Sequence, residues 1–318
     1  MSAMETKTKI VVITADDAGR RMDNYLFSEL KHVPKSRIYR AIRKGEVRVN
    51  KKRIKVEYKL QLEDQVRIPP ISQPEQAPAV RPSNNLVDLL QQRILYEDDK
   101  ILVLNKPSGI AVHGGSGIQL GVIEALRVIY PKLALELVHR LDRETSGCLI
   151  IAKRRSALRN MHAQMREGQV HKIYQCLVKG WLGKPQIRVD KPLYKNQLAS
   201  GERFVKIDLQ QGKPSATKFK EIERFEQTSL IEADLETGRT HQIRVHAQSL
   251  GCFLAGDDKY GDKDFDQKMK ALGLKRLFLH AMKITFKLPG SDEVKVISAP
   301  LDVELLDVLK RLREQRKL

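Results

Sequence analysis

One polar stretch, HRLDRETSG at residues 139–147, lies between two apolar runs at residues 135–138 and 148–152. Both runs are typical of short buried strands, so the polar stretch is predicted to be a loop held by a sheet. Such loops often carry catalytic groups, although a capped turn with a surface ion pair fits the residues equally well. If Leu141 points into the core, alternation turns Arg140 and Asp142 toward the opposite face and into one cleft.

HRLD, the following TSG and Lys153 together resemble the signature of the RluA-type pseudouridine synthases. The resemblance implies that Asp142 is the catalytic nucleophile and that Arg140 fills the space left by a flipped-out base. Asp190, Asp257 and Asp258 lack this setting. The implied reaction converts uridine to its C5-glycoside isomer without redox change, so no cofactor is expected.

Three further motifs carry the same resemblance. KIYQCLVKG at residues 172–180 implies that Tyr174 stacks on the target base and that its hydroxyl reaches a proton in transfer. TGRTHQIRVH at residues 237–246 implies that Arg244 pairs with Asp142 and leaves Arg239 to meet phosphate. RLFLHA at residues 276–281 implies that Leu279 walls the base pocket. From the residues alone, Tyr174 and Leu279 fit core positions of strands as well.

The formal net charge of +19 predicts a polyanionic partner, and nucleic acid is the obvious one. Residues 20–59 hold 14 Lys and Arg against 4 Asp and Glu, giving 14 − 4 = +10. An amphipathic helix is predicted from Met22 to Leu30, and Ser36 is expected to cap a second helix. Residues 19–69 resemble the S4 RNA-binding domain. The implied phosphate contacts are Lys35, Arg37, Arg40, Arg43, Lys44, Lys51, Lys52 and Arg53, and the alternative is a basic surface that binds nothing.

These patterns divide the chain into an N-terminal extension (1–18), an S4-like domain (19–71), a proline-rich linker (72–85) and a catalytic domain (86–318). Many strands with intervening helices, several joined as hairpins, predict an α+β fold with a mainly antiparallel sheet. The resemblance implies the pseudouridine synthase fold, with a catalytic cleft at the central sheet.

Several classes of protein fit the composition poorly. No apolar run approaches the ~20 residues that cross a bilayer, and no signal peptide is evident, so we expect a cytoplasmic location. Cys148, Cys176 and Cys252 are expected to be reduced thiols. His241 and His246 are five apart, not the four of a helical ligand pair, so no metal is expected. A metal-dependent nuclease would need clustered carboxylates near the basic elements, and the sequence offers none there.

The S4 module joined to this catalytic domain resembles the ribosomal RNA members of the family. We therefore expect a monomeric enzyme that acts on large-subunit (23S) ribosomal RNA, free or in an early assembly intermediate. A transfer RNA pseudouridine synthase of the same family is the first alternative. A ribosome-assembly protein that binds RNA without catalysis is the second, and the intact trio of Asp142, Tyr174 and Arg244 argues against it.

Overall fold

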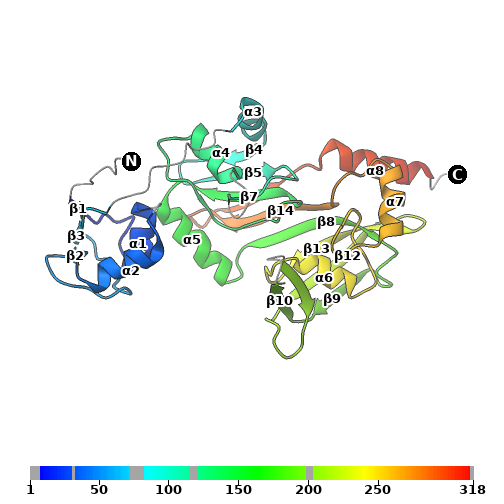
Figure 1. The fold of residues 1–318 in the computed structure, drawn as a ribbon. Helices are drawn as coiled ribbons and strands as arrows, with labels where there is room; N and C mark the ends of the chain where they lie inside the picture. The colour runs from blue at the N-terminus through cyan, green and yellow to red at the C-terminus, as the bar shows by residue number, and fades with distance from the viewer. Residues whose placement is uncertain (1–7, 31–32, 72–81, 115–119, 198–202, 316–318) are drawn as a thin grey trace, which may run out of the picture. The chain divides into compact units, whose positions relative to one another are not determined.

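The computed structural model describes residues 8–30, 33–71, 82–114, 120–197 and 203–315 (Figure 1). The chain forms two compact units, Met1–Arg81 and Pro82–Leu318. The division falls inside the predicted linker, of which residues 72–81 lie outside the described part. Ser83 belongs to the second unit, because its hydroxyl accepts from the backbone N–H of Leu86 and caps helix α3.

The first unit packs two helices against a three-stranded antiparallel sheet. Helices α1 (Met22–Glu29) and α2 (Lys35–Arg43) share one apolar core with the strands β1 (Lys9–Val12), β2 (Arg48–Val49) and β3 (Gln65–Ile68). The sheet order is β1-β3-β2.

Two expectations for this unit were wrong. Part of the predicted extension 1–18 is strand β1, which pairs with β3 in the sheet. The KIVV sequence has three apolar residues in a row, two of which, Ile10 and Val12, are exposed, so no alternation of apolar and polar residues marks it as a strand. Helix α2 begins at Lys35, so the residue at its N-cap is Pro34, which makes no side-chain cap hydrogen bond, and Ser36 lies inside the first turn.

The second unit is built on a ten-stranded sheet, in which the main path runs β4-β5-β7-β14-β8-β13-β12-β9. Strands β15 and β6 pair with β14 and β7 at its side. Every pairing in this described sheet is antiparallel except that of β7 with β14, which confirms the mainly antiparallel α+β prediction. The strands are β4 (Ile94–Glu97), β5 (Ile101–Lys106), β6 (Glu136–Leu137), β7 (Ser146–Ala152), β8 (His171–Lys179), β9 (Gln186–Asp190), β12 (Ala216–Arg224), β13 (Thr228–Leu235), β14 (Leu279–Lys287) and β15 (Val294–Ser298). The strands β10 (Leu193–Gln197) and β11 (Arg203–Ile207) pair antiparallel in a separate two-stranded sheet.

Helices cover both faces of this sheet (Figure 1). Strand β5 shows why, since Leu102 and Leu104 point into one buried cluster while Ile101 and Val103 point into another. Helices α3 (Asn84–Gln92), α4 (Val122–Ile129) and α6 (Gln242–Gln248) pack into the first cluster, and α5 (Arg155–Arg166) packs into the second. Helices α7 (Lys263–Ala271) and α8 (Val303–Gln315) bury a further cluster.

The parallel pairing of β7 with β14 depends on Gly147. This residue lies opposite Ala281 in the register and has φ +107°, a conformation that side chains rarely adopt. A Cβ at this position would lie 2.3 Å from the carbonyl oxygen of Ala281. No residue other than glycine therefore fits between the end of the 139–147 stretch and β14.

We predict that Gly147→Ala lowers the free energy of unfolding by about 3 kcal/mol, because strain at φ and the backbone clash add together. Gly168→Ala is the matched control. Gly168 also has a positive φ, of +71°, but a Cβ there would have no atom within 4 Å, so this variant should lose only about 1 kcal/mol. Urea denaturation measures both, and equal losses would contradict the clash.

Candidate active site

A pocket of about 380 Å³ opens in the second unit where the loop between β6 and β7, the start of β8, the loop after β13 and helix α6 meet. All six site residues predicted in this unit line it, namely Arg140, Asp142, Tyr174, Arg239, Arg244 and Leu279. Four separate sequence motifs therefore converge on one cavity.

The loop between β6 and β7 buries Leu141 and brings Arg140 and Asp142 to the pocket, but Leu141 also contributes to the pocket lining, so alternation describes the loop only in part. Leu141 is buried, with 4% of its surface exposed, and anchors the loop in the core. Arg140 and Asp142 line the pocket on either side of it. The backbone N–H of Thr145 donates to the Asp142 carbonyl at 3.1 Å and closes the turn that leads into β7. The Asp142 carboxylate therefore stands on a loop tied at both ends to the sheet.

Lys106, at the end of β5, binds the backbone of this loop. Its buried ammonium donates to the carbonyls of Pro107, Ile110 and Arg143 at 2.7, 2.8 and 3.0 Å. Three acceptors match the three N–H groups of a charged lysine, although burial lowers the pKa of Lys106 to about 7. Lys106 thus fixes the backbone one residue after Asp142.

Tyr174 enters the pocket from β8 and is 7% exposed. Burial raises the pKa of its hydroxyl, and the negative charge of Asp142 raises it further. The phenol therefore stays protonated at neutral pH. Leu279 at the start of β14 is 4% exposed. It lines the pocket and also belongs to a core cluster, so it is both a pocket wall and a core residue of its strand.

Arg244 does not form the predicted pair with Asp142. Its guanidinium instead makes a bidentate ion pair with Asp257, in which Nε lies 2.7 Å from Oδ2 and Nη2 contacts Oδ1, and it lies 3.7 Å from Asp258. Burial opposes the charge of Arg244, but Asp257 outweighs it and raises the pKa of Arg244. Asp257 was not predicted to belong to the site, because only the fold brings the segment after residue 251 beneath α6.

His241 is the described side chain whose cationic form would pair with Asp142, at 3.9 Å from Nε2 to Oδ2. The backbone N–H of Val205 donates to the Tyr260 hydroxyl, and that hydroxyl lies 2.8 Å from Nδ1 of His241. A hydroxyl that accepts from Val205 is free to donate to Nδ1, which favours the neutral tautomer with its proton on Nε2. Burial lowers the pKa of His241 to about 4 despite the opposing charge of Asp142, so the ring is neutral at pH 7.

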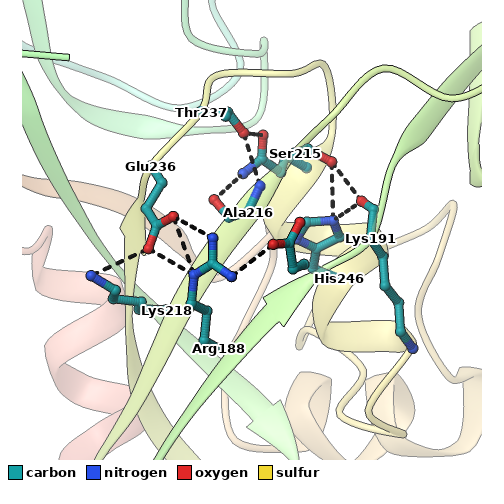
Figure 2. Close-up of polar contacts among 10 residues, drawn as sticks. Arg188, Lys191, Ser215, Ala216, Lys218, Glu236, Thr237 and His246 are labelled. Carbon is teal, nitrogen blue, oxygen red and sulfur yellow. Dashed lines mark hydrogen bonds and ion pairs between the residues drawn. The ribbon is translucent and has the colours of Figure 1, made fainter.

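A buried polar network holds helix α6 against β12. Figure 2 shows the His246 ring beside the Ser215 hydroxyl and the Lys191 carbonyl, at 3.3 and 2.9 Å from Nε2. The side-chain amide of Gln242 donates to the carbonyl of Ala216 and accepts from the hydroxyl of Thr237. These bonds fix the helix that carries Arg244 and the loop that carries Arg239. The Arg239 side chain donates from Nε to the Pro214 carbonyl at 3.2 Å.

The basic residues predicted to bind RNA in the first unit lie on its surface, with one exception. Arg37 is partly buried and forms an ion pair with Glu46 at 2.8 Å. Asn50 and Lys51 both adopt positive φ and form the turn that displays the last three cations. Seven of the eight predicted residues are exposed, namely Lys35, Arg40, Arg43, Lys44, Lys51, Lys52 and Arg53.

Two features are missing from the described part of the chain. No three His, Cys, Asp or Glu side chains gather there in a metal-binding group. None of its helices is both long and apolar enough to span a bilayer.

The chain is similar to known proteins over both of its units. A family model described as RNA pseudouridylate synthase matches residues 100–249, and an S4 domain model matches residues 20–66. The chain is 57% identical over 312 residues to the Ribosomal large subunit pseudouridine synthase C of Pasteurella multocida, covering 97% of this chain and 95% of the relative. The protein of the same name from Escherichia coli K12 is 55% identical over 320 residues, covering 98% and 100%. The chain belongs to the RNA pseudouridine synthase family.

Solved structures agree with the assignment of this pseudouridine synthase. Human RNA Pseudouridylate Synthase Domain Containing 4 matches with a TM-score of 0.61 and 27% identity, covering 72% of this chain and 96% of that one. Human RNA Pseudouridylate Synthase Domain Containing 1 matches with a TM-score of 0.57 and 25% identity, covering 74% and 98%. The enzyme is an isomerase that acts on RNA and carries an N-terminal S4 domain.

The Arg244–Asp257 pair predicts the behaviour of a variant of this synthase. Asp257→Asn should slow isomerisation about a hundredfold at saturating RNA, because a guanidinium freed from its clamp no longer keeps its place in the pocket. It should also lower the free energy of unfolding by about 3 kcal/mol, since it leaves a buried charge without its partner. Single-turnover kinetics and urea denaturation test both effects.

Asp258→Asn is the matched control for Asp257→Asn, because Asp258 is 92% exposed and touches Arg244 at 3.7 Å only. It should change neither the rate nor the stability. If the two variants behave alike, the clamp has no part in catalysis.

Two partly buried histidines of the synthase, His139 and His241, predict loss of stability in mild acid. Burial lowers the pKa of His139 to about 3 and that of His241 to about 4. In the unfolded chain both rings take up protons below about pH 6.5. Their contribution is therefore fully present above pH 6.5 and is lost as the pH falls toward 4.

Urea midpoints measured between pH 7.5 and 5 should fall steadily below pH 6.5. This pH range lies largely above the range in which carboxylates titrate, so the fall would report mainly on histidines. His139→Gln should reduce the slope, because Gln does not titrate and its carbonyl oxygen can accept the Ile150 N–H that His139 Nε2 accepts. A midpoint that stays constant down to pH 5 would rule out this explanation.

Proposed function

We propose that this pseudouridine synthase isomerises specific uridines of large-subunit (23S) ribosomal RNA, with Asp142 as the catalytic carboxylate. One observation carries the substrate: the chain is 55–57% identical over nearly its whole length, S4 region included, to two relatives named for the large ribosomal subunit. A transfer RNA substrate remains an outcome of the test below.

The proposed reaction needs only what the pocket holds. The target nucleotide leaves its stack, at a cost of a few kcal/mol that backbone contacts offset. The bond from N1 to C1′ breaks, uracil turns within the pocket, and C5 bonds to C1′. C5 then loses a proton and N1 carries one, so atoms and electrons balance without an oxidant or a cofactor.

Each pocket residue has a proposed part in this sequence. The Asp142 carboxylate either adds to C1′ or takes a ribose proton as uracil departs, and both routes use the same oxygens. Arg140, which is exposed beside it, occupies the space of the flipped base. The Tyr174 ring stacks on uracil while its protonated hydroxyl can donate to it. Leu279 closes the wall, and Arg239 meets phosphate.

Arg244 has a different proposed role from the one the motif implied. It lines the pocket while clamped to Asp257, and its charge is within electrostatic range of Asp142. A clamped guanidinium is preorganised, so it can favour the ionised carboxylate without a direct bond. His241, at the start of α6, would orient the Asp142 carboxylate through Nε2.

The seven exposed residues of the set predicted in the S4 unit are proposed to bind RNA phosphates and so raise the concentration of substrate at the pocket. We further propose that the enzyme acts as a monomer in the cytoplasm, where it meets the RNA before or early in assembly of the large subunit. Support for the location comes from the names of its relatives.

Asp142→Asn tests the proposal. It should abolish isomerisation while keeping RNA affinity within a few-fold, because the amide has nearly the same shape but no negative charge. Pseudouridines are mapped by carbodiimide-dependent reverse-transcriptase stops on ribosomal and transfer RNA from cells with wild-type or variant protein.

Loss of specific stops from large-subunit RNA in the variant supports the enzyme, its substrate and its carboxylate together. Loss of stops from transfer RNA instead would show that the substrate is transfer RNA and not large-subunit RNA. Unchanged stops on every RNA would refute the role of Asp142.

A further inference from the structure

Lys172 reaches into the pocket from the second residue of β8. It stands two positions before Tyr174, so strand alternation places both side chains on the same face, and both line the cavity. A Cβ on Gly238 would lie 3.4 Å from the Lys172 ammonium, which locates that group against the loop before α6. Its charge also helps to lower the pKa of His139 on the facing loop.

The ammonium of Lys172 has no hydrogen-bond or ion-pair partner among the described residues, although the side chain is partly buried. Lys106 differs from Lys172 in this respect, because its buried ammonium donates to three backbone carbonyls. Burial lowers the pKa of Lys172, and no neighbouring carboxylate counteracts this. A desolvated charge without a partner destabilises the fold. Such a group is expected where a ligand supplies the missing partner.

The charges around Lys172 indicate the kind of ligand. Four cations line the pocket, Arg140, Lys172, Arg239 and Arg244, against one carboxylate, Asp142. Asp257 neutralises Arg244, and Arg239 donates to a backbone carbonyl. Arg140 is exposed. Lys172 is therefore the cation that is both partly enclosed and ready to bind an anionic oxygen.

We propose that the Lys172 ammonium binds an anionic oxygen of the flipped target nucleotide. This inference rests on the proposed isomerisation at Asp142. Two sources share the chemistry. One is a backbone phosphate. The other is a uracil oxygen, because the base that departs with the bonding electrons of N1–C1′ spreads negative charge to O2 and O4. The ammonium would stabilise that charge without giving up a proton, so the proton balance of the reaction is unchanged.

Lys172→Met removes the charge and keeps the length of the side chain, and Lys172→Arg keeps the charge. Lys220→Met is the matched control, because Lys220 is an exposed residue of β12 in the same unit and does not line the pocket. For each protein we would measure the RNA dissociation constant and its salt dependence, the single-turnover rate at saturating RNA, and the thermal midpoint.

If the oxygen belongs to phosphate, Lys172→Met should weaken RNA binding about tenfold and reduce the salt slope by about one, with the rate within twofold. If it belongs to uracil, the rate should fall about a hundredfold with affinity within twofold. Lys172→Arg should recover part of either loss. In both cases the thermal midpoint of Lys172→Met should equal or exceed that of the wild type, because an unpaired ammonium has been removed.

Two results would overturn the inference. The first is a Lys172→Met protein that matches Lys220→Met in affinity, salt slope and rate. The second is activity lost together with a lower thermal midpoint and not recovered by Lys172→Arg, which would indicate a structural lysine. If the wild-type protein makes no pseudouridine, the proposed isomerisation fails instead, and the salt slope still tests Lys172.

Discussion

The pairing of β7 with β14 holds the catalytic unit together, because it is where distant parts of the chain meet. Strand β7 continues from the loop that carries Asp142, and β14 begins with Leu279 and pairs on its other side with β8, which carries Tyr174. The approach is so close that only a glycine fits at position 147. The distances among three pocket residues are thus set by backbone hydrogen bonds rather than by contacts between their own side chains.

A second layer of contacts arranges charge around this frame. Asp257 forms an ion pair with Arg244, and Lys106 donates a hydrogen bond to the loop backbone one residue past Asp142. His241 is neutral at pH 7 because burial lowers its pKa. Arg244 and Lys106 therefore have partners of their own, and the His241 ring carries no charge, so none of the three is left as an unpaired cation beside Asp142. Lys172 is the exception, and it lines the cavity that the substrate is proposed to fill.

The sequence predicted the pocket well where chemistry lies within a motif. Arg140, Asp142, Tyr174, Arg239, Arg244 and Leu279 were named from four motifs and share one cavity. Partners were predicted less well, because pairing depends on segments joined only by the fold. Arg244 turns to Asp257 thirteen residues on, and His241 meets Tyr260 nineteen residues on. Neither spacing reflects a regular helix or strand, so periodicity could not reveal these contacts.

Strand β1 has a consequence for the first unit as a separable module. The S4 resemblance starts at residue 19, yet residues 9–12 supply one of the two neighbours of β3. A fragment cut at residue 19 would leave one side of β3 with unpaired N–H and C=O groups, an edge that invites pairing with a second chain. Residues outside the recognisable domain thus complete its sheet, and the module that folds is longer than the module that a motif delimits.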